Sequence, residues 1–198
     1  IGIKKSIAKE IKMPEGTFTE GNYNTVKDAI KDIENVQTVF DTSKDIGTEL
    51  TEGYEPTSLT PLLRDSKRLY NHIITQTRAV AKARFEALGQ GENFHSLDEA
   101  LKENTYTDVS RTQNTIYQRL SYDKPSGTVV NVRKSMWIHP TINRAISVRE
   151  AARLQTFPDS FIFCGTKDSQ YQQVGNAVPP ILAKAIAEHL ALYLDKNG

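Results

Sequence analysis

Apolar residues recur at helical spacing in the segment that begins at Ser147. Ser147 and Glu150 form an S-x-x-E pattern, in which the hydroxyl accepts the glutamate amide and the carboxylate accepts the serine amide. Ala151, Ala152 and Leu154 follow, so we predict a helix that begins here. A Pro-Asp-Ser sequence then ends this helix, and residues 161–163, with the sequence Phe-Ile-Phe, predict a short buried strand.

A second helical pattern occupies the C-terminal end of the chain. Pro179 and Pro180 suit its first turn, because proline lacks only a donor that would have no partner there. Gly175 and Asn176 come just ahead of this turn, and a glycine and an amide beside a helix N-terminus can hold a polar or anionic group. The positions on the packed face of this helix are Ile181, Leu182, Ala185, Ile186, His189, Leu190 and Tyr193.

The N-terminal half of the chain gives weaker patterns. Residues 25–33 place apolar side chains on one side and predict a short amphipathic helix. Residues 35–57 lack a period and contain two glycines, so we expect a loop. Residues 58–88 predict a helix, which the β-branched residues that follow Asn71 and His72 are expected to interrupt.

Between residues 112 and 132 the apolar period shortens to two. Residues 114–121 and 126–132 predict two strands joined by a turn, which together form a β-hairpin. Arginine and lysine side chains make this hairpin basic, so it is suited to a DNA groove, where cations meet phosphates and polar side chains read base edges. Trp137 lies just beyond, and we interpret it as a core residue, with a groove-facing ring as the alternative.

The charge distribution agrees with this interpretation. The net charge is only +1, but residues 111–153 carry eight cations against two acids, and residues 61–90 carry six against two. Residues 1–60, in contrast, carry seven cations against eleven acids. Alternating basic and acidic blocks suit a DNA-facing cleft with a neutralised exterior, although an unevenly charged surface explains them equally well.

Composition disfavours several classes of protein. No apolar run approaches the roughly 18 residues of a membrane span, and no signal peptide is evident, so we expect a cytoplasmic protein. A single cysteine, Cys164, excludes an internal disulfide and a cysteine-rich metal site, and we interpret it as a buried thiol. His72 has no second ligand at a suitable spacing, so we expect a structural or DNA-contacting histidine and no metal.

Two long motifs give a specific resemblance. Residues 144–161 read R-x-x-S-V-R-E-A-A-R-L-Q-x-F-P-D-x-F, and residues 172–180 read Q-x-V-G-N-A-V-P-P. In this order they resemble the ninth and tenth sequence motifs of the DNA (cytosine-5) methyltransferases. The T-V-x-x-A-I-x-D pattern at residues 25–32 resembles a segment that precedes the recognition domain in bacterial relatives.

The resemblance implies an α+β fold with a small DNA-recognition domain. Flanking helices would complete a Rossmann-like domain that binds S-adenosyl-L-methionine and lies mostly outside this chain. Residues 1–20 would end the catalytic domain, residues 21–143 would form the target recognition domain, and residues 144–198 would return to the catalytic domain. The chain begins with Ile1, not Met, and we expect it to be the C-terminal portion of a longer protein or the smaller subunit of a split enzyme.

The resemblance also implies roles for individual residues. Gly175, Asn176 and Ala177 match the tenth motif and would contact S-adenosyl-L-methionine. Thr128 and Val129 match the threonine–aliphatic pair of the recognition domain, whose threonine contacts the DNA backbone. Arg119, Lys124, Arg133 and Lys134 would bind DNA, phosphates above all. Arg144, Arg149 and Glu150 match the ninth motif and would brace the recognition domain against the catalytic domain, a structural role more than a catalytic one.

The catalytic parts of this family are expected to lie elsewhere. The chain contains no F-x-G-x-G, P-C-Q or Q-x-R-x-R motif, so we expect the catalytic cysteine and glutamate motifs to be absent and the chain alone to be inactive. It would instead bind double-stranded DNA and the missing N-terminal catalytic portion, and would self-associate through its apolar C-terminal helix. The alternative is a DNA-binding module or regulatory remnant that works without catalysis.

Overall fold

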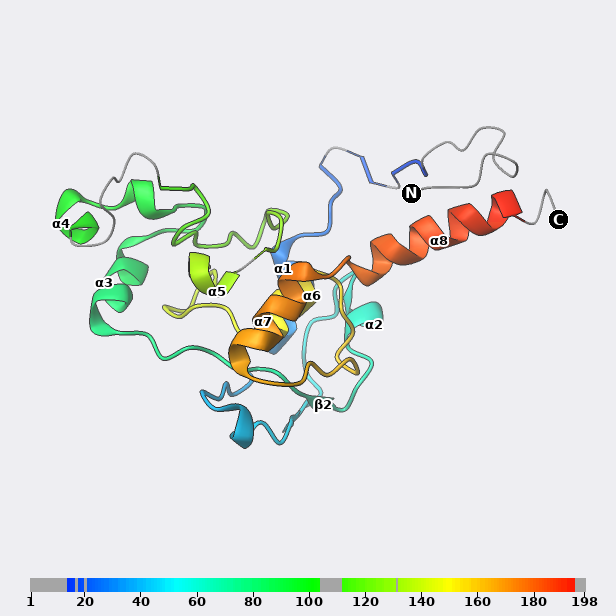
Figure 1. Ribbon diagram of the computed structural model, residues 1–198, viewed down its shortest axis with the longest axis horizontal. Helices are drawn as coiled ribbons and strands as arrows, with labels where there is room; N and C mark the ends of the chain where they lie inside the picture. The colour runs from blue at the N-terminus through cyan, green and yellow to red at the C-terminus, as the bar shows by residue number, and fades with distance from the viewer. Residues whose placement is uncertain (1–13, 17, 20, 104–111, 131, 195–198) are drawn as a thin grey trace. The chain divides into compact units, whose positions relative to one another are not determined.

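The computed structural model describes residues 14–16, 18–19, 21–103, 112–130 and 132–194 (Figure 1). The chain divides into two compact units, Asn24–Ala177 on the one hand and Ile1–Tyr23 with Val178–Gly198 on the other. The ninth-motif segment therefore belongs to the same compact unit as the residues before it. Within the described residues, no helix has the length and apolar character needed to cross a membrane.

The larger unit begins with the short helix expected from the sequence. α1 (Val26–Ile30) continues into a 3-10 turn, η1 (Lys31–Ile33). Thr25 and Asp28 form a capping box, in which the carboxylate accepts the Thr25 amide at 2.7 Å. The apolar face of α1 packs against α6 (Val148–Leu154), and α6 packs against α7 (Lys167–Asn176), so these three helices form the centre of the unit (Figure 1).

The helix expected over residues 58–88 is confirmed in its interruption near Asn71 and His72, whereas its helical parts are much shorter than expected. α2 (Thr60–Leu63) and α3 (Ala79–Ala87) are short helices at its two ends. Between them, β2 (Arg68–Leu69) pairs antiparallel with β1 (Thr48–Glu49), and Ile73 bridges Val39 in parallel. Pairing with residues 39–49, far away in sequence, holds this stretch extended. Among residues 35–57 a 3-10 turn, η2 (Thr42–Lys44), adds the remaining regular structure.

The expected β-hairpin over residues 114–132 is also wrong. Arg119 bridges Ile138 in parallel, and Ile138 bridges Ala145 antiparallel, so the partners of this stretch lie downstream. Residues 126–130 lie outside any strand, and α5 (Val132–Ser135) begins at the last residue of the second expected strand. Two more short elements, η3 (Phe94–Ser96) and α4 (Glu99–Lys102), precede this region.

The C-terminal helices are confirmed, whereas the strand predicted over residues 161–163 is wrong. α6 begins with the Ser147–Glu150 capping box, and α8 (Pro180–Leu194) begins at the second proline. Residues 161–163 lie outside any strand, and the Phe161 and Ile162 side chains are 48% and 47% exposed. The rings of Phe157, Phe161 and Phe163 instead pack on one another with centroids 4.9–5.1 Å apart.

Buried apolar side chains of the larger unit form two clusters. The main cluster lies around α1, α6 and α7 and contains Trp137, which is fully buried, as expected. The second cluster links α3 to the segment after α4. Its buried members are Phe85, Leu88, Phe94, Leu97, Tyr117 and Ile138. Segments from both halves of the sequence contribute to each cluster, so residues 24–177 fold as one body.

Candidate functional site

A buried ion pair holds the start of α6. Arg144 donates from Nη1 to Glu150 Oε2 at 2.7 Å and from Nη2 to Oε1 at 2.6 Å. Oε2 also accepts the Ser147 amide at 2.7 Å. Burial alone would raise the pKa of the Glu150 carboxyl, but the Arg144 guanidinium outweighs burial and lowers this pKa to about 2. The carboxylate is therefore charged and fully engaged in holding the chain.

Two buried histidines lie beside this pair. His72 Nδ1 is 2.9 Å from Ser147 Oγ, and His139 Nε2 is 3.7 Å from Glu150 Oε1. Burial lowers the pKa of each imidazole to about 4, although the Glu150 carboxylate opposes the effect. Both side chains are therefore neutral near pH 7. The interpretation of His72 as a structural histidine agrees with this placement.

Arg149 joins α6 to two other segments through its guanidinium. Nε donates to Tyr70 O at 2.8 Å, Nη1 to Pro158 O at 3.0 Å, and Nη2 to Phe161 O at 2.7 Å and Asn71 Oδ1 at 3.1 Å. Asn71 adopts a positive φ of 64°. Burial lowers the pKa of Arg149 to about 10, so the side chain remains a cation near pH 7. These bonds fix the backbone where the sequence predicts a break in the helix.

Arg153 extends the network to the N-terminal side of the unit. Its Nε donates to Asp159 Oδ1 at 2.9 Å, and its Nη1 donates to Asp32 Oδ1 in η1 at 2.5 Å. The three ninth-motif arginines thus connect α6 to segments as distant in sequence as residues 32 and 71. These side chains hold segments of the same unit together, and the carboxylate oxygens and guanidinium nitrogens that do so have their partners within the chain.

The residues expected to contact DNA fall into two groups. Thr128, Lys124 and Lys134 have exposed side chains, so they are accessible to a ligand. Arg133 is half-buried, and Val129 is buried in the main cluster. Val129 anchors the backbone in the core, and the side chain of the neighbouring Thr128 remains accessible to solvent.

Arg119 does not fit the expected role. Its Nε donates to Leu88 O at 2.7 Å, Nη1 to His139 O at 2.8 Å, and Nη2 to Phe85 O and to Asn143 Oδ1 at 2.6 Å. The residue is 4% exposed, and burial lowers its pKa. The guanidinium nitrogens donate to backbone carbonyls and to Asn143, so none remains for a phosphate. The expected role of Arg119 in DNA binding is therefore wrong, and its role is structural.

The tenth-motif residues end α7. A Cβ atom added to Gly175 would lie 2.0 Å from Val130 O, so the glycine allows the two backbones to touch. The Ala177 amide donates to Val174 O at 3.3 Å and is occupied. The Asn176 side chain is exposed and makes no hydrogen bond to another described residue. Of the three residues expected to contact the cofactor, Asn176 alone presents a side-chain amide that a polar ligand group could reach.

Gln155, which was not among the predicted site residues, connects the segment that carries Thr128 to the end of α7. Its buried Nε2 donates to Val174 O in α7 and lies 3.4 Å from Val129 O. One side chain therefore bonds to the backbone of both segments and holds them close together within one unit. The neighbouring residues in the sequence do not indicate that this glutamine bonds to two distant backbone segments.

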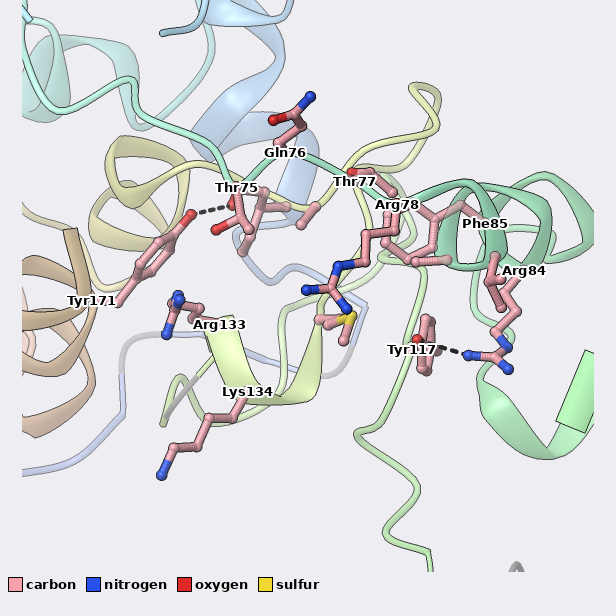
Figure 2. A pocket seen from close by; sticks show the side chains of 15 residues that line it. Thr75, Gln76, Thr77, Arg78, Arg84, Phe85, Tyr117, Arg133, Lys134 and Tyr171 are labelled. Carbon is pink, nitrogen blue, oxygen red and sulfur yellow. Dashed lines mark hydrogen bonds between the residues drawn. The ribbon is translucent and has the colours of Figure 1, made fainter. Parts of the chain in front are cut away.

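A cavity of about 530 Å³ lies between residues 75–85, α5 and Tyr171 (Figure 2), and we call it the Arg78 cavity. Arg78 extends toward it from the segment before α3, and Arg133 and Lys134 come from α5 (Figure 2). Arg78 is not among the residues predicted to bind DNA, although the basic block at residues 61–90 contains it.

Two expectations about catalytic groups need correction. Glu34-Asn35-Val36 does read E-N-V, the letters of the family's glutamate motif, which the sequence analysis counted as absent. The Glu34 carboxylate, however, accepts hydrogen bonds from Lys31, Tyr122 and Thr141, and these outweigh burial and lower its pKa to about 2.

Those three donors leave Glu34 in a structural position.

Cys164, expected to be a buried thiol, is exposed. Cys164 directly follows the Phe-Ile-Phe sequence, and its backbone carbonyl accepts a hydrogen bond from Gln173 Nε2 at 2.9 Å. Among the described residues, no group of three or more His, Cys, Asp or Glu side chains is placed to hold a metal ion.

Comparison with known proteins identifies the family. The sequence model of the C-5 cytosine-specific DNA methylases matches residues 1–191. The chain belongs to this family. A solved structure described as a DNA modification methyltransferase encoded within a prophage (E. coli) shares the fold, with a TM-score of 0.63 and 24% identity over 86% of this chain and 47% of that one.

Several bacterial methyltransferases are similar to this family member in sequence. The type II methyltransferase M.DdeI of Desulfomicrobium norvegicum is 29% identical over 98% of this chain and 50% of its own length. M.AgeI of Thalassovita gelatinovora is 52% identical, but over 36% of this chain and 18% of its own length. The chain thus spans at most half the length of these relatives.

Proposed function

We propose that this chain is the target-recognition and cofactor-closing portion of a DNA (cytosine-5) methyltransferase of a restriction-modification system. The remaining portion would supply the cysteine that attacks a flipped cytosine and most of the S-adenosyl-L-methionine pocket. Family membership and the similarity to type II methyltransferases support the reaction. The chain's own share would be to hold DNA and to complete the pocket.

The observation that carries the proposal is the back-to-back contact between residues 128–130 and the end of α7. Gly175 lies close to Val130, and Gln155 bonds to the Val129 and Val174 carbonyls, so the segments that carry the exposed Thr128 and Asn176 are held together. We assign Thr128, Lys124 and Lys134 to DNA and Asn176 to the cofactor. S-adenosyl-L-methionine would supply the methyl group, and the Asn176 amide would bind and orient a polar group of it.

α8 belongs to the other compact unit and carries the expected partner-binding face. Its Ile181 and Leu182 side chains are 37% and 50% exposed. Apolar surface of this kind is usually covered by a partner. We assign it to the catalytic portion, and to self-association when that portion is absent.

The test is reconstitution of methyl transfer. This chain is mixed with the cysteine-bearing portion from the same source, and transfer from labelled S-adenosyl-L-methionine to cytosine-containing duplex DNA is measured. Transfer that requires both parts, with neither active alone, is the expected result. Duplex binding by this chain without transfer in any pairing would instead support the second candidate, a DNA-binding module that works without catalysis.

A further inference from the structure

The Arg78 cavity combines apolar walls with a cationic edge. Phe85, Met136 and Ile146 are among its apolar lining residues, and its volume of about 530 Å³ lies within the range of small-molecule sites, roughly 300–1,000 Å³. Arg78, Arg84, Arg133 and Lys134 also line it, and none of its 15 lining residues is acidic. A ligand that fits this lining has a flat apolar part and a negative charge.

The arginines of the cavity differ in how far they are engaged. Arg84 donates to Leu101 O at 2.7 Å and to Tyr117 Oη at 3.2 Å, so it supports the wall (Figure 2). Arg133 Nη1 pairs with Asp168 Oδ2 at 2.8 Å. Arg78 is exposed, and its guanidinium has no hydrogen-bond or ion-pair partner among the residues the structure describes. The charge available to an anionic ligand therefore comes first from Arg78.

Two buried polar atoms of the lining lack partners. Thr75 Oγ1 and Arg133 Nε are both shielded from solvent, and neither makes a hydrogen bond within the described part of the chain. Such atoms are rare in native proteins and call for an explanation. Both atoms belong to side chains that line the cavity, so a rotation of either side chain toward a bound ligand would supply the missing partner.

We propose that the Arg78 cavity binds one unstacked nucleotide of a DNA strand. The base would lie against Met136 and Ala81 with its edge toward Thr75, and the phosphate would lie between Arg78 and Arg133. An unstacked base gains from contact with aromatic and apolar side chains whatever its identity, and arginine supplies the phosphate contact. The assignment rests on the proposed function, which makes DNA the ligand, and adds a site for a nucleotide other than the target cytosine.

The two methionines of the chain make a local test possible. Met136 lines the cavity and Met13 lies outside the described residues, so methyl-¹³C-methionine labelling gives two signals, which Met13→Leu assigns. The whole chain is titrated with single-stranded (dT)8 and with an eight-unit abasic strand that carries the same phosphates. We expect (dT)8 to shift the Met136 signal through the ring currents of the base and to bind about tenfold or more tightly than the abasic strand.

Three cavity variants and a matched control locate the site. Arg78→Gln removes the available cation, Thr75→Val removes the hydroxyl with little change of shape, and Val80→Asp places a carboxylate in the lining at the first turn of α3. Val80 is 62% exposed, and an acid is favourable near a helix N-terminus, so the fold is expected to tolerate this change. Lys82→Gln, on the same helix but outside the lining, is the control.

We expect Arg78→Gln to weaken (dT)8 binding about tenfold, as loss of a charged hydrogen bond does, and Lys82→Gln to change it less than about twofold. Equal binding of (dT)8 and the abasic strand, or equal effects of Arg78→Gln and Lys82→Gln, would overturn the proposal. A Met136 shift with dTMP alone at the concentrations at which (dT)8 acts would overturn the assignment to a DNA strand. Normal duplex binding without a base-dependent Met136 shift contradicts the cavity site alone, whereas absence of any DNA binding contradicts the proposed function as well.

Discussion

Arg144 and Glu150 face each other through two parallel hydrogen bonds of 2.7 and 2.6 Å, and the carboxylate is completely buried. Charged groups taken out of water need partners of this quality, since the loss of hydration is large. The pair also fixes the Ser147 amide, so it ties the chain before α6 to the helix itself. The stability of this region should therefore depend strongly on one carboxylate.

We expect Glu150→Gln to lower the free energy of unfolding by about 3–5 kcal/mol, because it leaves Arg144 buried without a counter-charge. Urea denaturation followed by circular dichroism measures this. Glu86→Gln is the matched control, since Glu86 meets Lys82 at 3.8 Å with both side chains more than half exposed. It should cost less than about 1 kcal/mol. Similar losses for the two variants would contradict a special role for the buried pair.

Stability should also fall as the pH drops below about 6.5. In the folded chain the pKa of His72 and of His139 is about 4, below the ordinary value of 6.5, so between these values the unfolded chain binds more protons. Each histidine then contributes a slope of up to about 1.4 kcal/mol per pH unit. At lower pH, between about 4.5 and 2, protonation of Glu150 removes further stability.

His139→Gln should reduce the slope of unfolding free energy against pH between 6.5 and 4, measured by denaturation at a series of pH values. Replacement of the exposed His95 by glutamine is the control and should leave the slope in place. A slope that is unchanged in both variants would show that His139 does not carry the effect.

Gly175→Ala should destabilise the fold, although alanine normally improves a helix by about 0.5–1 kcal/mol relative to glycine. The new Cβ would lie 2.0 Å from Val130 O, and both groups are backbone, so one segment has to move. We expect a loss of about 1–3 kcal/mol, as for overpacked sites. Gly127→Ala, which would meet Trp137 at an ordinary 3.8 Å, is a control on the segment that leads to Thr128. Equal stability of the two variants would count against the close approach.

Lys124→Gln should weaken binding to duplex DNA and reduce the dependence of the logarithm of affinity on the logarithm of salt concentration by about one unit. The reason is the loss of one phosphate contact by an exposed cation. Fluorescence anisotropy at several salt concentrations gives this slope. Lys44→Gln is the control, because Lys44 is exposed in η2, far along the chain from the basic segments. An unchanged slope for Lys124→Gln would remove this residue from the proposed interface.

Local chemistry was enough to predict some elements correctly. The capping box at Ser147 and Glu150 and the proline start of α8 depend on neighbouring residues, so a short stretch of sequence contains all their partners. The burial of Trp137 also followed from its size and apolar character. The family motifs worked for the same reason, because their residues are contiguous.

The wrong predictions share a different cause. The stretch at residues 64–78 contains helical spacing, but its backbone pairs with residues 39–49 and is held by Arg149. Residues 114–132 alternate like strands, yet Arg119 pairs with Ile138. Short apolar patterns of this kind give no information about a distant partner, and the partner decides the conformation.

The sequence by itself determined the family of this protein and the starts of its capped helices. Only the tertiary structure decided that backbone carbonyls surround Arg119 and that the backbone of Val130 lies directly against Gly175. It also decided that Arg78 lines a cavity. The physical reason is that the role of a charged or small side chain depends on which distant groups surround it. Burial and hydrogen-bond partners are properties of the folded chain.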